Sequence, residues 1–132
     1  MSRPLALMIE DDRDLANRFA AGWQTVGIEP GLVHDGDQAL ARLAGLGPDL
    51  VLLDLQIPCT PGVDIVREIR TDVRLSETCI IVVTADPRAA EDIRDDVDLV
   101  LIKPISFDLL HDLVARMVLA VSPDEEGSHS TD

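Results

Sequence analysis

The sequence predicts a single α/β domain built on a five-stranded, mostly parallel β-sheet with helices on both faces. The first observation is that five short apolar runs alternate with five segments whose apolar residues recur at helical spacing. The second is that the intervening loops are short, which favours strand–helix–strand units over separate strand and helix regions. At 132 residues the chain has the length of about one domain, so these units are expected to share one fold.

Each expected strand is a short apolar run bounded by turn-forming residues, as is typical of buried parallel strands. The runs cover residues 5–9, 28–33, 50–54, 78–83 and 99–102. The run at 28–33 has the weakest pattern. The run ending at Asp54 has the strongest, because consecutive leucine and valine residues lead directly into a single carboxylate. We therefore expect this strand to be central and to deliver Asp54 to a site.

The expected helices cover residues 15–26, 39–46, 63–70, 87–93 and 110–121. In the first helix, Asp12 or Asp14 is in place to cap the N-terminus and Gly27 to stop the C-terminus. In the third helix, Arg67 and Arg70 are expected to point outward, since the apolar stripe lies on the other face. The last helix has the clearest stripe and is followed by polar sequence.

The fourth helix is expected to be short. Asp86 is suited to cap it and Pro87 to occupy its first position, where a missing N–H costs nothing. Only a few apolar residues follow before acidic residues end the segment.

Composition narrows the classes of partner. Lysine and arginine total 11 against 25 aspartate and glutamate residues, which gives a formal net charge of −14. Direct, sequence-independent binding to nucleic acid or to an anionic membrane is therefore not expected. A cation is the expected partner.

The expected domain covers residues 1–121, followed by an acidic, apolar-poor and disordered tail over 122–132. The two cysteines, Cys59 and Cys79, are too few for a disulfide framework, and the first residues do not form a secretory leader. A cytoplasmic location is therefore expected, with Cys79 in the core and Cys59 an unactivated residue in a loop. No apolar run reaches the length of a membrane span.

Polar residues follow the predicted strands where each ends. Glu10-Asp11-Asp12, Asp54, Thr84 and Lys103 close four of the five runs. The carboxyl ends of parallel strands meet at one edge of a sheet, and ligands bind there at the point where strand order reverses. These side chains are therefore expected to converge.

This set of residues supports a narrow range of chemistry. Crowded carboxylates must bind a cation, share protons or destabilise the fold. Oxygen ligands with retained water suit Mg²⁺, and a lysine opposite the metal can neutralise a phosphoryl group. A threonine hydroxyl can donate to the same group. Attack of the Asp54 carboxylate on phosphorus would give an aspartyl phosphate.

These motifs, in this order, resemble the receiver domain of bacterial two-component response regulators, which has a flavodoxin-like (βα)5 sandwich fold. The resemblance covers residues from about 5 to 121 and rests on Glu10-Asp11-Asp12, Asp54 with Pro58 and Gly62 after it, Thr84-Ala85, and Lys103-Pro104. Each motif is weak alone, but the ordered set is a strong signal.

The resemblance implies a role for each acidic residue of the site. Asp54 would be the phosphoacceptor and would give one oxygen to Mg²⁺. Asp11 would ligate the metal directly, Glu10 would assist through water, and the backbone carbonyl of Gln56 would supply a further ligand. Asp12, one position beyond the usual pair, is expected to cap a helix instead.

The resemblance also assigns the residues around the phosphoryl group. Thr84 would be the switch hydroxyl and Lys103 the ammonium that pairs with the phosphate. The side chains of Gln56 and Asp86 would tune the lifetime of the acyl phosphate. The bond before Pro104 would be cis, which is common only before proline.

Three departures from the family pattern concern the output face. Val100 stands where many receivers have an aromatic residue, the interval from Thr84 to Lys103 is shorter than usual by about one helical turn, and Asp96-Val97 replaces a common Gly-Ala pair. We hypothesise that the phosphorylation chemistry is retained, whereas the coupling to partners is altered, through the last helix or a dimer contact.

The resemblance implies that a histidine kinase or phosphotransfer protein donates the phosphoryl group and that an unidentified protein receives the signal. The domain would be a monomer or weak homodimer, and not an enzyme beyond self-catalysed transfer and slow autodephosphorylation. An effector domain outside this chain stays an open alternative, because no output module follows residue 121.

Other functions remain as alternatives. A phosphorylation-independent pseudo-receiver would act as a binding module, but the intact acid, Thr84 and Lys103 set argues against it. An aspartyl-phosphate hydrolase would need a second acid where Gln56 stands. Flavodoxin-like cofactor binding would need a phosphate loop after the first strand. The three histidines, His34, His111 and His129, stand apart in sequence, so no metal role is expected for them.

Overall fold

The computed structural model describes residues 3–45 and 47–121, so the expected tail at 122–132, which includes His129, lies outside the described residues. The elements in chain order are β1 (Leu5–Ile9), α1 (Arg13–Thr25), β2 (Glu29–Val33), α2 (Gly36–Gly45), β3 (Leu50–Asp54), α3 (Gly62–Thr71), the 3₁₀ turn η1 (Val73–Leu75), β4 (Cys79–Thr84), the 3₁₀ helix η2 (Pro87–Asp96), β5 (Leu99–Ile102) and α4 (Phe107–Val121).

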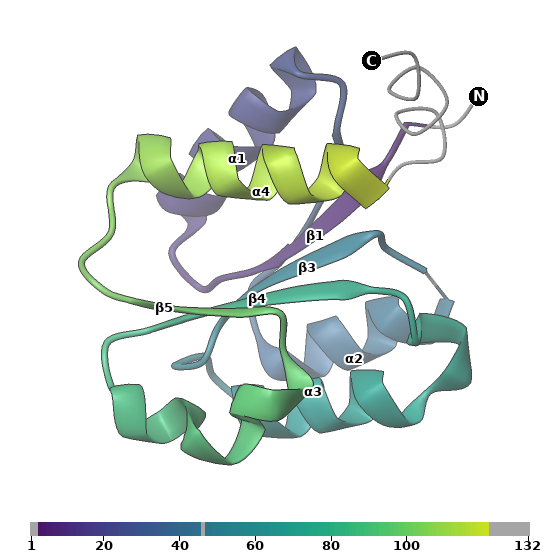
Figure 1. Ribbon diagram of the computed structural model, residues 1–132, viewed down its shortest axis with the longest axis vertical. Helices are drawn as coiled ribbons and strands as arrows, with labels where there is room; N and C mark the ends of the chain where they lie inside the picture. The colour runs from purple at the N-terminus through teal and green to yellow at the C-terminus, as the bar shows by residue number, and fades with distance from the viewer. Residues whose placement is uncertain (1–2, 46, 122–132) are drawn as a thin grey trace.

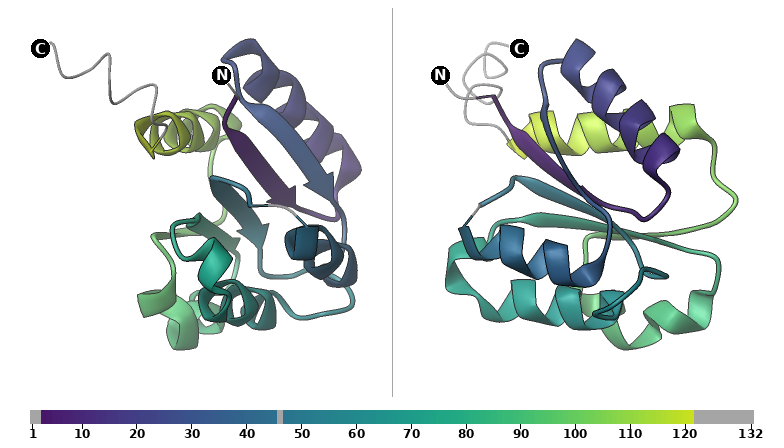
Figure 2. Two further views of the ribbon diagram at one scale, coloured as in Figure 1. Left: turned by 90° about the vertical axis from the view of Figure 1, so that its right-hand side faces the viewer. Right: turned by 180° about the vertical axis from the view of Figure 1, so that it is seen from behind.

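The five strands form one parallel sheet in the order β2-β1-β3-β4-β5. Helices α1 and α4 cover one face, and α2, α3 and η2 cover the other (Figure 1). The two further views show the same three layers (Figure 2). The predicted (βα)5 sandwich is therefore confirmed. The strand order reverses between β1 and β3, which puts the switch point beside the end of β3.

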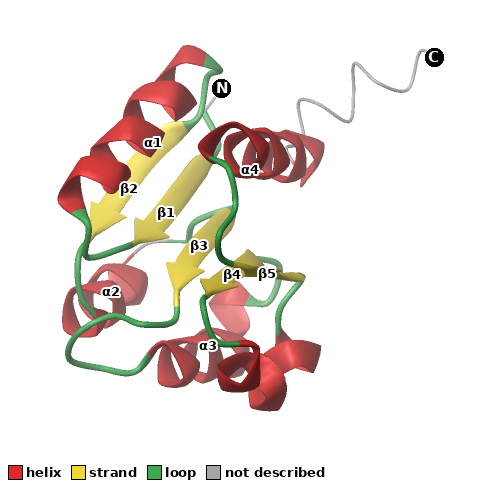
Figure 3. Ribbon diagram, turned by 90° about the vertical axis from the view of Figure 1, so that its left-hand side faces the viewer, coloured by secondary structure: helices red, strands yellow, loops and turns green. Residues whose placement is uncertain are grey.

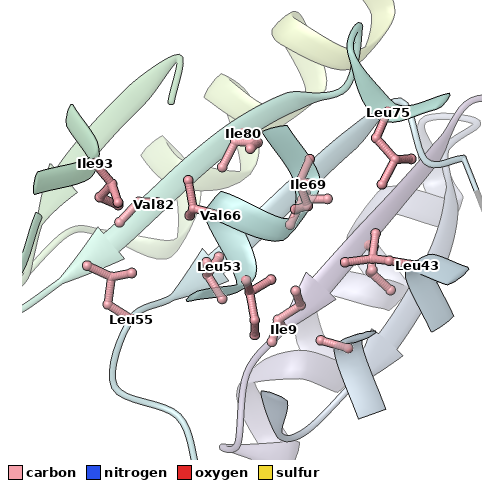
Figure 4. Packing of buried hydrophobic residues seen from close by; sticks show 14 of the residues in the cluster. Ile9, Leu43, Leu53, Leu55, Val66, Ile69, Leu75, Ile80, Val82 and Ile93 are labelled. Atoms are coloured by element: carbon pink, nitrogen blue, oxygen red, sulfur yellow. The ribbon is translucent and has the colours of Figure 1, made fainter. Parts of the chain in front are cut away.

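Two apolar cores lie on the two faces of the sheet, because successive strand residues point in opposite directions. Leu53 of β3 faces α2 and α3, in the cluster drawn in Figure 4. Its neighbour Leu52 faces α1 and α4, where Trp23 and Val114 are fully buried. Cys79 is also buried on this side, as expected.

Helix α1 begins and ends where the predicted capping residues lie. The Asp12 side chain accepts a hydrogen bond from the Leu15 N–H at 3.1 Å, so Asp12 caps the helix. Helix α1 ends at Thr25, and Gly27 has φ of +84°, a conformation that favours glycine.

The fourth helical segment differs from the expected helix. It begins as predicted, with Asp86 accepting from the Arg88 N–H at 3.0 Å and Pro87 in the first turn. It is a 3₁₀ helix, however, and buries only Ala90 and Ile93. These two residues are three positions apart, the repeat of a 3₁₀ helix, so this winding keeps both on the α3-facing side.

The expectation that Arg70 points outward is wrong. Its guanidinium donates to the carbonyl oxygens of Asp96 at 2.6 Å and Thr78 at 2.9 Å, and to the Asp98 carboxylate at 3.2 Å. Near the end of helix α3, the end of η2 and Thr78, which directly precedes β4, offer carbonyl groups that accept hydrogen bonds from the guanidinium. Arg67, in contrast, is exposed as expected.

The expectation that all strands are buried is wrong for β5. This edge strand is half-buried, and Ile102 is 41% exposed. Helix α4 packs against β3 and β4, which leaves the side of β5 less covered. Among the described residues, no helix is long and apolar enough to span a membrane.

Candidate functional site

The predicted site residues meet at the carboxyl edge of the sheet, toward which the strand arrowheads point in Figure 3. Glu10 directly follows β1, Asp54 ends β3, Thr84 ends β4, and Lys103 directly follows β5. Strands β1, β3, β4 and β5 are consecutive neighbours in the sheet. Segments far apart in the sequence therefore share one small region because of the strand order.

Asp54 is only 5% exposed, and both of its carboxylate oxygens are hydrogen-bonded. Oδ1 accepts from the backbone N–H of Gln56 at 2.9 Å, and Oδ2 accepts from Lys103 Nζ at 2.7 Å. The buried negative charge is thus compensated by one ammonium and one peptide dipole.

The position of Lys103 is fixed by its backbone. Its N–H donates to the Thr84 carbonyl at 2.9 Å, and the bond to Pro104 is cis. Burial alone would lower the pKa of Lys103, but the hydrogen bond and ion pair with Asp54, reinforced by the charges of Glu10 and Asp11, raise it above the ordinary value. Lys103 is therefore a permanent cation at neutral pH.

Glu10 is buried beside this pair, with 5% of its surface exposed. Burial raises the pKa of Glu10 to about 7; the N–H of Asp12, which donates to Oε2 at 3.0 Å, opposes the rise, and the charge of Asp54 adds to it. His34 Nδ1 lies 3.0 Å from the Glu10 carbonyl oxygen. His34 thus contacts the backbone of the site, a contact that sequence reasoning missed.

The Thr84 side chain is fully buried, and its hydroxyl contacts Gln56 and Asp86. Gln56 Nε2 lies 3.0 Å from Thr84 Oγ1, and Gln56 Oε1 lies 3.2 Å from the same atom. The backbone N–H of Asp86 donates to Oγ1 at 3.1 Å. The contact between the Gln56 side chain and Thr84 gave no signal in the sequence, because it joins the loop after β3 to the end of β4, 28 positions away.

The donor set suits a hard cation. Glu10, Asp11 and Asp54 bring three carboxyl groups to the region of one ammonium, and Asp11 is exposed to solvent. Within residues 3–45 and 47–121 no group of three or more His, Cys, Asp or Glu side chains is placed so that it could hold a metal ion by itself. Mg²⁺ usually takes one or two carboxylates and keeps several waters, so this arrangement fits it.

A cavity of about 600 Å³ opens beside Asp54 and Lys103. Its walls are mostly apolar and include Phe19 and Phe107, and the Arg18 guanidinium lies 4.1 Å from the centre of the Phe107 ring. Sequence reasoning missed this cavity, because its lining residues have the same apolar spacing as ordinary core positions.

Cys59 lies in the loop after β3, is exposed, and has φ of +73°. Partial desolvation and the charges of Asp35 and Asp37 raise the pKa of its thiol. The cysteine is therefore not activated as a thiolate, as expected from the sequence.

The model of the response regulator receiver domain family matches residues 6–115. The chain belongs to this family. It is 36% identical over 99 residues to the DNA-binding response regulator MtrA of Mycobacterium tuberculosis, a match that covers 75% of this chain but 39% of MtrA. The chain thus spans about two fifths of the length of this longer relative.

Solved receiver structures agree with the fold. A sensor protein from Polaromonas sp. is 31% identical with a TM-score of 0.76, and the match covers 91% of this chain and 99% of that one. The response regulator TrrA from Thermotoga maritima, solved with Mg²⁺ and beryllofluoride, is 25% identical with a TM-score of 0.73, over 86% of this chain and 98% of that one.

Membership in this family identifies the chain as a receiver domain of two-component signalling and does not favour a phosphorylation-independent binding module. The family is not one of conventional enzymes. MtrA is named as a DNA-binding protein. The expectation of no direct contact with nucleic acid therefore does not extend to a full-length protein of that kind.

Proposed function

We propose that Asp54 of this receiver domain accepts a phosphoryl group from a phosphohistidine of a histidine kinase or phosphotransfer protein. The observation that carries the proposal is the Asp54–Lys103 contact of 2.7 Å at the end of β3, beside the buried Glu10. It provides a carboxylate nucleophile and a fixed cation in one place.

In the transfer step, one Asp54 carboxylate oxygen attacks the phosphorus atom of the phosphohistidine. The new O–P bond forms as the N–P bond breaks, and the imidazole leaves with the electron pair of that bond. The product is an acyl phosphate. Lys103, which donates to Oδ2 of Asp54 at the outset, is close enough to transfer its hydrogen bond to a phosphoryl oxygen.

Mg²⁺ would be held by Asp11, Asp54 and the Gln56 carbonyl, with Glu10 acting through water. When bound, the metal neutralises charge on the phosphoryl oxygens. The carboxyl groups of this chain align the cation, and Thr84 supplies a hydroxyl at the adjacent strand end. Burial is the main reason that the pKa of Glu10 is raised, and the charge of Asp54 adds to it, so a cation at this edge would be attracted to both carboxyl groups.

Loss of the phosphoryl group would follow by slow, self-catalysed attack of water on phosphorus, which restores the carboxylate and releases inorganic phosphate. Gln56 and Asp86 flank Thr84 and are suited to control the access of this water. Beyond these two steps the domain catalyses no reaction on an external substrate.

The domain that carries this function would be residues 1–121, with 122–132 as an acidic extension. We place it in the cytoplasm as a monomer or weak homodimer that signals through an unidentified protein partner. The acidic balance of the chain, −14, does not favour direct contact of this domain with nucleic acid.

The test is incubation with a small acyl phosphate and Mg²⁺, followed by intact-mass measurement. One phosphoryl-sized mass increase is expected, and Asp54→Asn should abolish it. Asp49→Asn is the control, because Asp49 lies at the opposite end of β3 and its side chain accepts the Leu5 N–H. The absence of any mass increase, together with no Mg²⁺ binding, would instead support a pseudo-receiver.

A further inference from the structure

Gln56 contacts both the phosphoacceptor and the switch hydroxyl. Its backbone N–H donates to Asp54 Oδ1 at 2.9 Å, and its side-chain amide lies against Thr84 Oγ1, at 3.0 Å from Nε2 and 3.2 Å from Oε1. The amide oxygen also accepts from the Ala85 N–H at 3.4 Å. One residue therefore ties the end of β3 to the end of β4.

These contacts use the full hydrogen-bonding capacity of the Thr84 hydroxyl. A hydroxyl has one donor and two acceptor sites. Gln56 Nε2 and the Asp86 N–H fill the acceptor sites, and Gln56 Oε1 and the Asp86 carbonyl, both at 3.2 Å, compete for the single proton. The hydroxyl must release one of these carbonyl groups before it can donate to a group on Asp54.

We propose that Gln56 is a positioning residue that holds the Thr84 hydroxyl in its resting arrangement. Its side chain thereby sets the free energy needed to release this hydroxyl toward a group on Asp54. This proposal rests on the proposed function of Asp54 and Thr84 and adds the residue that opposes the switch. Thr84 is fully buried, so water does not replace the amide freely when the contact is broken. The free energy needed to break this contact therefore lowers the stability of the phosphorylated state.

Asp86 contacts Thr84 through backbone groups, whereas Gln56 contacts Thr84 through its side chain. The Asp86 contacts to Thr84 use only the N–H and C=O of Asp86. The Gln56 contacts to Thr84 use only the side-chain amide, whereas its contact to Asp54 uses the backbone N–H. We call the contact between the Gln56 side-chain amide and the Thr84 hydroxyl the latch. Gln56→Met removes the latch, because methionine has a similar length but no amide, and it leaves the backbone groups of residue 56 in place.

The experiment is a double-mutant cycle on the affinity for beryllofluoride in the presence of Mg²⁺, measured by calorimetry on wild type, Gln56→Met, Thr84→Val and the double variant. Gln56→Met should tighten binding by about two- to tenfold, the range of one net hydrogen bond. In the Thr84→Val background the same change should have no effect, since the hydroxyl that it releases is absent.

An equal change in affinity in both backgrounds would mean that the size of the Gln56 side chain matters and its hydrogen bonds to Thr84 do not, which would overturn the latch. Unchanged or weaker beryllofluoride binding by Gln56→Met would overturn it as well. Gln56→Ala repeats the cycle if the methionine variant has an altered melting temperature. If wild type itself neither binds beryllofluoride nor gains a phosphoryl group, the proposed function fails and the latch with it. Binding by wild type without coupling overturns the latch alone.

Discussion

Lys103 Nζ donates a hydrogen bond of 2.7 Å to Asp54 Oδ2 across 49 positions of sequence. The two residues stand at the ends of β3 and β5, which are not neighbours, because β4 lies between them. The lysine side chain therefore reaches past the end of β4, where Thr84 is buried. The charge that compensates the Asp54 carboxylate therefore comes from the residue that follows the edge strand β5.

Replacing Lys103 by alanine is expected to lower the free energy of unfolding by about 1–2 kcal/mol. Asp54 stays buried and loses its counter-charge, but the Lys103 side chain is 38% exposed, so the cost is below that of a fully buried pair. Urea denaturation at neutral pH measures it. In an Asp54→Asn background the same substitution should cost much less, and an equal loss in both backgrounds would contradict an energetic role for the pair.

The sheet and the site residues were predictable because both depend on local pattern and one general rule. Apolar runs such as that ending at Asp54 specify buried strands, and the carboxyl ends of parallel strands meet whatever the details of packing. That argument brought Asp54 and Lys103 together, and the structure has them 2.7 Å apart. The ligand roles of Asp11 and Glu10 stay predictions.

The features that the sequence did not predict all depend on tertiary surroundings. Arg70 lies on the polar side of its helix by periodicity, but it donates hydrogen bonds to the carbonyl groups of Asp96 and Thr78, which turn its side chain inward. The exposure of Ile102 depends on where α4 packs. The contact between Gln56 and Thr84 depends on the conformation of the loop after β3, which no periodic pattern encodes.

Bound at the folded carboxylate cluster as proposed, Mg²⁺ is expected to raise the melting temperature, because the unfolded chain offers no such cluster. At ten times the dissociation constant the gain is about 1.4 kcal/mol, or a few degrees for a domain of this size. Calorimetry with and without millimolar Mg²⁺ measures it, and Asp11→Ala should abolish the increment. Asp12→Ala is the matched control. Loss of the α1 cap should lower the free energy of unfolding without metal by about 1 kcal/mol, but the rise in melting temperature on adding Mg²⁺ should remain.

Arg70→Ala is expected to destabilise the fold by about 2 kcal/mol, because it removes three hydrogen bonds that join α3 to Asp96, Thr78 and Asp98. Arg67→Ala, on the same helix, should cost less than about 0.5 kcal/mol. Arg67 is exposed and lies 3.9 Å from Asp64. Urea denaturation of both variants gives the comparison, and similar losses would show that the inward contacts of Arg70 contribute little.

The two terminal glycines of α2 should respond oppositely to alanine. A Cβ on Gly36 would overlap the backbone of Thr60, in the loop that follows Asp54, so Gly36→Ala is expected to cost about 2 kcal/mol or more. A Cβ on Gly45 meets open space, and helix propensity predicts a gain of up to about 1 kcal/mol. Melting temperatures decide the matter: a neutral Gly36→Ala would mean that the loop moves aside freely.

The two cysteines should differ in reactivity toward iodoacetamide, because the thiolate is the nucleophile that displaces iodide from this reagent. Burial raises the pKa of Cys79 to about 12, so at pH 8 its thiolate is scarce as well as covered. Cys59 is exposed, and its pKa is also raised, so it should react slowly at pH 8 and faster as the pH rises past 9. Intact mass should show one adduct on the native protein and two after urea unfolding. Cys59→Ser should show none when native. Labelling of native Cys79 at the rate of Cys59 would mean that β4 opens far more readily than the burial of Cys79 implies.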